Sequence, residues 1–130
     1  RKKMSNPFIR NFDELIVNIK NDINSGESSL YIAKDDESSM IKELLVQNLE
    51  RNINGKKVTF LAIRNIVLKE EFKGNGYFSK FLMELESLNV NIMFHDVINS
   101  RLMNFLKTKN FKEYKEKKYE DEVISLYKEF

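Results

Sequence analysis

The fold is decided by the segment Lys73-Gly74-Asn75-Gly76-Tyr77-Phe78, which lies just past the middle of a 130-residue chain. An apolar run over residues 58–68 precedes it, and an amphipathic run over residues 77–85 follows it. This order predicts a strand, a glycine loop and a helix. Such a loop aims several backbone N–H groups at one point, beside the positive end of the helix dipole. The segment therefore predicts a site that suits a pyrophosphate group.

Downstream of the loop, the pattern predicts further strands and a short helix. Residues 90–95 read as a strand, residues 99–107 as a short helix, and residues 111–114 and 123–126 as two closing strands. The charged stretch 115–122 between the closing strands is predicted to be a solvated loop.

Upstream, two helices and a short strand are expected. Asn11 can cap the first helix with Glu14 as its reciprocal partner, and Ser25-Gly26 ends it. Residues 30–33 read as a strand, and residues 38–51 are predicted to form a second helix. The buried stripe of that second helix would be Ile41, Leu44, Leu45 and Leu49.

The long apolar run before the glycine loop has one polar interruption. Asn54-Gly55 marks a turn at its start, and Arg64-Asn65 breaks it near its end. A β-bulge at Arg64-Asn65 would explain the break; two shorter strands, or a buried strand with a polar edge, would explain it equally well. The whole pattern predicts an α/β fold in which helices flank a mixed β-sheet.

Composition limits the classes of protein to which the chain can belong. Its 22 basic and 20 acidic residues give a net charge of +2, which makes a nucleic-acid partner the weakest expectation. There is no cysteine and a single histidine, so neither a disulfide framework nor a multi-histidine metal site is expected.

A single domain is expected to span residues 1–130, with residues 1–8 as a flexible arm. No apolar run reaches the roughly 18 residues of a membrane span, and the basic start lacks a signal-peptide apolar region. The chain is therefore expected to be cytoplasmic.

The glycine loop and the strand before it resemble the acetyl-CoA signature of the GNAT family of N-acetyltransferases. That signature is a hydrophobic strand, then Arg or Gln, two variable residues, Gly, one variable residue, and Gly or Ala. Lys73 stands at the Arg/Gln position, Gly76 at the first glycine, and Phe78 where Gly or Ala is usual. The Phe78 side chain must therefore point away from the phosphates.

The segment from Asn99 to Phe111 resembles the closing helix of the same family, which opens with Asn and ends in a Gly-Phe pair. Asn110-Phe111 stands in place of that pair, and Asn is the residue that best replaces Gly at a left-handed helix terminus. Many family members use a Tyr in this helix as the general acid that protonates the leaving thiolate. The matching position here is Leu106.

The resemblance implies a small single-domain GNAT fold with a splayed central strand pair that forms an acyl-CoA cleft. Acetyl-CoA would be a co-substrate, with no metal. The strand backbone would pair with pantetheine, the loop N–H groups would hold the pyrophosphate, and a helix asparagine would approach the thiol. The residues implied are Ile66, Val67, Leu68, Lys73, Gly74, Asn75, Gly76, Tyr77, Phe78 and Asn99.

Amine acetylation needs a base, because a primary amine of pKa about 10.4 is almost fully charged at neutral pH. The candidates are His95 and Asp96 at the end of a strand, and Glu70 and Glu71 beside the loop. Each has a simpler explanation: the glutamates as solvated carboxylates, His95 as a hydrogen-bonded residue under the cofactor, and Asp96 as a cap.

The resulting hypothesis is an acyl-CoA-dependent N-acyltransferase that moves acetyl to a primary amine by direct attack in a ternary complex. Because there is no cysteine, a covalent cysteine intermediate is excluded. The alternative is a weakly active or inactive module of the same fold that acts by binding CoA or a partner. The acceptor is of unknown class. The small size of the chain suggests a narrow acceptor wall, or a homodimer that completes it.

Overall fold

The strand before the glycine loop, β4 (Lys56–Leu68), is the central strand of the sheet in a computed structural model that describes residues 8–26 and 30–130. Within those residues the chain forms one seven-stranded sheet of order β1-β2-β3-β4-β5-β7-β6 and three α-helices. The other strands are β1 (Phe8–Ile9), β2 (Leu30–Ala33), β3 (Ile41–Ile53), β5 (Ile92–Phe94), β6 (Lys112–Lys118) and β7 (Asp121–Lys128). The helices are α1 (Phe12–Ser25), α2 (Tyr77–Glu86) and α3 (Ser100–Thr108), with a short 3-10 turn, η1 (Glu70–Phe72).

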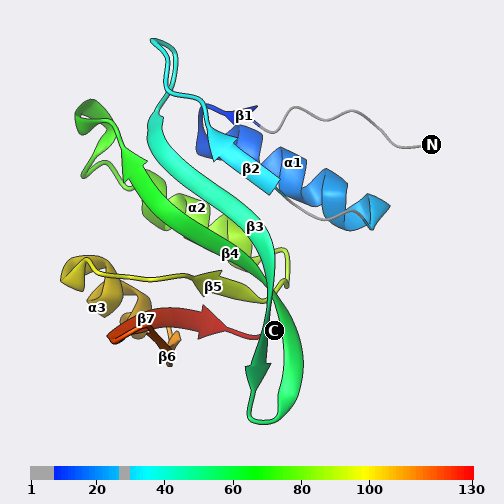
Figure 1. The fold of residues 1–130 in the computed structure, drawn as a ribbon. Coiled ribbons are helices and arrows are strands. Elements are labelled where there is room, and N and C mark those ends of the chain that lie inside the picture. Colours follow the sequence, from blue (N-terminus) through cyan, green and yellow to red (C-terminus); the bar gives the residue numbers. More distant parts are fainter. Residues whose placement is uncertain (1–7, 27–29) are drawn as a thin grey trace.

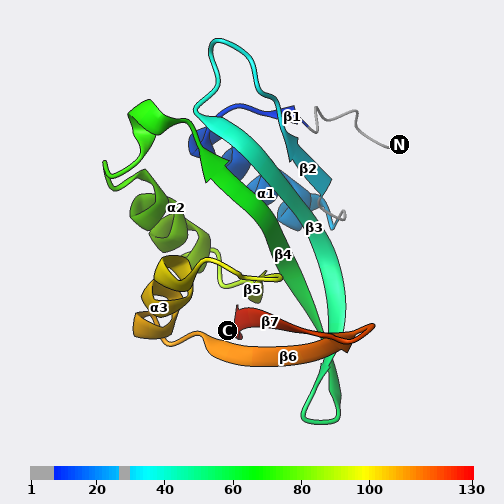
Figure 2. The same cartoon turned by 60° about the vertical axis from the view of Figure 1, so that its left-hand side comes forward.

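The sheet is mixed and is covered by helices on one face (Figures 1 and 2). β1 pairs with β2, and β4 with β5, in parallel, whereas the other neighbours are antiparallel. On the covered face, the helices and the sheet share one apolar core. Phe12 of α1 stacks on Phe81 of α2 with ring centroids 4.4 Å apart, which joins the first helix to the helix after the loop. The predicted α/β class with a mixed sheet is confirmed.

The opposite face of the sheet, which we call the open face, is partly closed by the curl of the sheet itself. A second apolar cluster of strand residues lies there, and Phe60 of β4 contacts Tyr127 of β7 edge-to-face at 5.7 Å. Arg51 of β3 reaches Glu116 of β6 at 3.1 Å, although these strands are not neighbours in the sheet. Figure 2 shows the β6–β7 hairpin crossing beside β3 and β4.

The helix predicted over residues 38–51 is wrong, because this segment is strand β3. A two-residue turn at Asn54 and Gly55, with φ of 52° and 83°, joins it to β4 as a hairpin. Val46 is buried against the helices, whereas Leu45 and Leu49 are half-buried on the open face. Apolar residues on both faces of a strand fall at spacings of three and four, which imitates a helix.

The solvated loop predicted over residues 115–122 is also wrong. Residues 115–118 belong to β6 and residues 121–122 to β7, and only Tyr119 and Glu120 form the turn between them. β6 lies at the edge of the sheet, where Lys and Glu side chains reach water and protect a strand from unwanted pairing.

The ends of the predicted elements agree more closely. Asn11 accepts from the N–H of Glu14 and caps α1, and Gly26 ends that helix at φ 74°. The Glu14 carboxylate accepts from the N–H of Arg10 rather than from that of the capping residue. Of the predicted flexible arm, residues 1–7 lie outside the described residues. The prediction is wrong for Phe8, which pairs with Ile32 in β1. In the part of the chain that the structure describes, no helix is long and apolar enough to cross a membrane.

Candidate functional site

The central feature of the site is a fork between β4 and β5. Within the described residues, their pairing runs from Leu61 to Ile63 of β4, and the N–H of His95 then donates to Ile63 O at 3.0 Å. β4 continues to Leu68, whereas β5 ends and the chain turns away through Asp96 at φ 56°. The two strands therefore separate, and the far half of β4 has β3 as its neighbour on one side alone.

A β-bulge occurs in β4 at the point where the fork begins. Arg64 pairs with Leu45 and Val67 with Glu43, so β4 uses one residue more than β3 over this interval. Asn65 takes a left-handed conformation at φ 51°, which Asn tolerates better than most residues. The bulge predicted at Arg64-Asn65 is confirmed.

The backbone of β4 beyond the bulge presents polar groups to the fork. The N–H of Lys69 donates to Met40 O at 3.0 Å, toward β3. Since alternate residues of a strand direct their backbone groups to opposite sides, Ile66 and Leu68 direct theirs toward the side that β5 has left. A ligand with amide groups could pair there as an added strand would.

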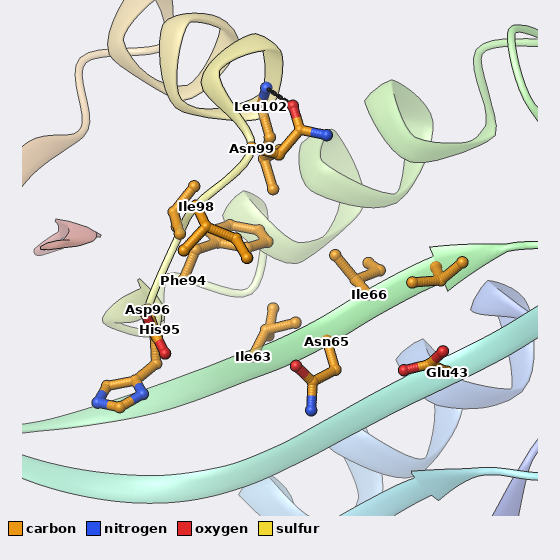
Figure 3. A pocket seen from close by; sticks show the side chains of 12 residues that line it. Glu43, Ile63, Asn65, Ile66, Phe94, His95, Asp96, Ile98, Asn99 and Leu102 are labelled. Carbon is orange, nitrogen blue, oxygen red and sulfur yellow. Dashed lines mark hydrogen bonds between the residues drawn. The ribbon is translucent and has the colours of Figure 1, made fainter. Parts of the chain in front are cut away.

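Two adjoining cavities follow the fork toward the glycine loop. The fork cavity, of about 270 Å³, is lined by residues of β3, β4 and the segment from Phe94 to Leu102 (Figure 3). The loop groove, of about 490 Å³, runs between β4, the glycine loop, α2 and α3. Both cavities share the same four residues, Ile66, Val67, Asn99 and Leu102. The two cavities therefore adjoin along β4, and we call them together the channel.

The two ends of this channel carry opposite charge. Among its described lining residues, the loop groove has Lys73 and Arg101 and no carboxylate. The described lining of the fork cavity has the carboxylates of Glu43 and Asp96 and no Lys or Arg. An anionic ligand is therefore favoured at the loop end, and a cationic ligand at the fork end.

The glycine loop contains two residues in the left-handed conformation. Gly74 and Gly76 have φ of 76° and 79°, a region that Gly enters without the Cβ clash of other residues, and Gly76 is the N-cap of α2. The Lys73 ammonium lies 3.0 Å from the Glu70 carboxylate, and Asn75 Nδ2 donates to Glu71 O at 3.2 Å. These two side chains thus also brace the loop.

The predicted cofactor residues are brought together in part. Seven of them line the loop groove: Ile66, Val67, Leu68, Lys73, Gly74, Phe78 and Asn99. Asn75, Gly76 and Tyr77 are not among the described residues that line it. The Tyr77 ring lies against Phe72 at 5.9 Å, on the other side of the loop.

Phe78, the largest departure from the family signature, packs its ring inward. Its centroid lies 5.8 Å from that of Phe94, 5.8 Å from that of Phe105 and 6.3 Å from that of Phe81. The ring therefore joins α2 to β5 and α3, and it remains partly accessible along the groove wall.

Asn99 lies at the junction of the two cavities. Its Oδ1 accepts from the N–H of Leu102 at 3.0 Å and caps α3, as the dashed line in Figure 3 shows. Because the oxygen is used by the cap, its Nδ2 is the group that can donate to a ligand.

The four candidate bases occupy different places. Glu70 and Glu71 are not among the described residues that line either cavity, and the Glu70 side chain is 87% exposed. Asp96 is exposed and lines the fork cavity. Its backbone N–H donates to Ser125 Oγ, which helps to hold its left-handed turn. Asp96 therefore combines an exposed carboxylate with a place on the wall of the fork cavity.

His95 is buried, and the ring nitrogen that can accept a hydrogen bond already has a donor. Its side chain is 1% exposed, and its Nδ1 accepts from Arg64 Nε at 2.8 Å. Burial lowers the pKa of His95, the Arg64 and Arg51 guanidinium groups lower it further, and the Glu116 carboxylate opposes them. The ring is thus neutral at pH 7, with its proton on Nε2. To act as a base, it would first have to release Arg64.

Some residues of the site were not found from the sequence. Glu43 was assigned to a helix, so nothing placed it beside the fork, and Arg101 carried no motif that marked it. Leu106, which the sequence resemblance aligns with a Tyr, is fully buried. Among the described residues, no three His, Asp or Glu side chains come together as a metal site would require.

No protein-family model, curated protein or solved structure matches this chain.

Proposed function

We propose that the chain is an acyl-CoA-dependent N-acyltransferase that transfers acetyl from acetyl-CoA to a primary amine. The proposal rests on one observation above the others. A fork in the sheet, with unpaired β4 backbone on one side, opens directly into the groove of a glycine loop at a helix N-terminus. This combination suits a ligand that has amides in the middle and a pyrophosphate at one end, as CoA has.

The direction of binding follows from the charges. The pyrophosphate would lie at the loop end of the channel, which Lys73, Gly74 and Arg101 line. The pantetheine amides would pair with Ile66 and Leu68, and the thioester would reach the fork cavity near Asn99. The amine would then enter from the end that carries Glu43 and Asp96, whose carboxylates attract a cationic acceptor.

The reaction is a direct transfer. The neutral amine nitrogen attacks the thioester carbonyl carbon, a C–N bond forms and the C–S bond breaks. The amine proton passes to a base, for which Asp96 is the best-placed side chain. CoA leaves as the thiolate and takes a proton from water. A backbone N–H of the β4 bulge is the candidate donor to the carbonyl oxygen as negative charge develops there.

A second candidate function is a binding module of the same fold that holds CoA and does not turn it over. It is favoured by Leu106, because the acid that many family members use at that position is replaced by a buried leucine. The two candidates differ in one measurable respect: the enzyme releases free CoA thiol when an amine is added, and the module does not.

The first test is calorimetric titration with acetyl-CoA of the wild type and of a Gly76→Asp variant. Gly76 is the N-cap of α2, so Asp at this position adds a carboxylate at the helix N-terminus, where it would repel a pyrophosphate bound at the loop end of the channel. Gly55→Asp is the matched control, because Gly55 has nearly the same φ of 83° but lies in the β3–β4 turn. Both variants therefore bear similar backbone strain, and they differ in their distance from the groove.

Binding in the micromolar range by the wild type and Gly55→Asp, and a loss of at least tenfold in Gly76→Asp, is the expected result. An amine screen with detection of the free thiol then separates enzyme from module. If the folded wild type does not bind acetyl-CoA at millimolar concentration, both candidates are wrong.

A further inference from the structure

A pair of side chains joins β4 to β5 at the start of the fork. Arg64 Nε donates to His95 Nδ1 at 2.8 Å, one residue beyond the backbone pairing of Ile63 with Phe94. Each member of the pair is followed directly by a left-handed residue, Asn65 at φ 51° and Asp96 at φ 56°. The two chains thus turn apart immediately after the residues that hold them together.

The pair is part of a longer polar chain across the open face. His95 Nε2 lies 3.6 Å from Glu116 Oε1 of β6, and the other oxygen of Glu116 lies 3.1 Å from Arg51 Nε of β3. These facing atoms of Arg51, His95 and Glu116 are buried from solvent. The curl of the sheet therefore covers the Nε2 side of the His95 ring, so that little water reaches it.

We propose that Arg64 and His95 form a clamp that fixes where β4 and β5 separate, and that protonation of the His95 ring releases it. Both residues act as positioning residues, since neither needs to touch a ligand. The clamp determines how much of β4 is left unpaired and where the fork cavity begins.

The charges around the ring explain why the clamp needs a neutral histidine. The bond from Arg64 uses the one lone pair that the neutral ring offers, and a proton on Nδ1 would remove it. The charged groups that face the ring are Arg64 of β4, Arg51 of β3, and Glu116 and Lys118 of β6, with the Asp96 carboxylate next along the chain. Three cations and one facing anion disfavour a second positive charge on the ring, so protonation would set it against Arg64.

The clamp can be observed directly, because the chain has a single histidine. Nitrogen-15 NMR of the imidazole is expected to show a neutral ring at pH 7 with its proton on Nε2. It should also show a midpoint of titration below that of free histidine. A proton on Nδ1 at pH 7, or an ordinary midpoint, would overturn the proposal.

Amide hydrogen exchange then tests whether the pair fixes the fork. The N–H of His95, bonded to Ile63 O, and the N–H of Leu61, bonded to Asn91 O, lie at the two ends of the same short β4–β5 ladder. In an Arg64→Gln variant, the N–H of His95 is expected to exchange about tenfold faster relative to that of Leu61. A merely structural role would accelerate both amides equally, and that result would overturn the clamp.

Arg10→Gln is the matched control, because Arg10 also bonds a partner through Nε but does so with Asp36, in the segments that follow β1 and β2 and not between β4 and β5. Its exchange ratio should equal that of the wild type. In Arg64→Lys, a charged donor remains. The exchange rate of the His95 N–H relative to that of Leu61 is therefore expected to lie between the values of the wild type and Arg64→Gln.

The effect on ligand binding rests on the proposed function. Arg64→Gln is expected to weaken acetyl-CoA binding about tenfold at pH 7, and the wild type to weaken similarly below the His95 midpoint. If the wild type does not bind acetyl-CoA but the exchange ratio changes as expected, the proposed function is wrong and the clamp stands. If the ratio does not change, the clamp is wrong whatever the binding shows.

Discussion

The two halves of β4 belong to one strand but have different neighbours. Residues 56–63 pair with β3 throughout and with β5 over their last part, and Phe60 and Ile63 are buried there. Among the strands that the structure describes, residues 64–68 pair with β3 alone, and their side chains are half-buried or exposed. The first half contributes to the core, whereas the second leaves backbone groups that need water or a ligand as partners. One half of the strand thus stabilises the fold, and the other half is accessible to a ligand.

The largest expected effect comes from replacing the same residue type in each half. Ile63→Ala should lower the free energy of unfolding by about 2–5 kcal/mol, because it leaves a cavity in the core. Ile66→Ala should lower it by about 1 kcal/mol, because this half-buried side chain lines the channel. Urea denaturation of both variants measures the difference. Equal losses would mean that the second half of β4 is packed as tightly as the first.

A smaller effect is expected at the boundary between the halves. Asn65→Val places a β-branched residue at φ 51° and should cost about 1–3 kcal/mol, whereas Asn65→Gly should cost little. Thr59→Val is the control in the first half, where an exposed strand position should change stability by about 0.5 kcal/mol or less. If Asn65→Val is as well tolerated as Thr59→Val, the bulge does not require a left-handed residue.

The smallest expected effect is the pH dependence of stability that His95 contributes. Because the folded state lowers the His95 pKa from 6.5, the unfolded chain binds more protons between the folded pKa and 6.5. The free energy of unfolding should rise with pH across this window, and the contribution should be lost as pH falls through the folded pKa. Urea denaturation over a pH series, compared with His95→Gln, isolates it. Identical slopes in the two proteins would show that the ring is not held neutral.

Much of the region around the loop could be predicted from the sequence, because its signals are local. The glycines of the loop, the apolar stripe of α2 and the caps at Asn11 and Asn99 each act within a few residues of themselves. The polar pair Arg64-Asn65 marked the position of a break in the strand, but three structures could explain it, and the pairing with β3 shows that it is a bulge.

The errors arose where distant segments decide the structure. Whether residues 41–53 form a helix or a strand depends on pairing with β4, which outweighs the helical spacing of their apolar residues. β6 was missed because an edge strand can carry charges on most of its side chains. Because β3 was predicted to be a helix, the position of Glu43 beside the fork was not predicted either. No local sequence pattern marks Glu43 as a site residue.

The order strand, glycine loop and helix is encoded locally, because backbone preferences and short-range hydrogen bonds fix those features within a few residues. Tertiary structure alone decided that β5 leaves β4 after Ile63, that Arg64 and His95 meet there, and that Glu116 reaches Arg51 across the open face. These contacts join residues 31 or more positions apart in the sequence. Pairing, twist and curl of the whole sheet bring such residues together, and no local pattern records them.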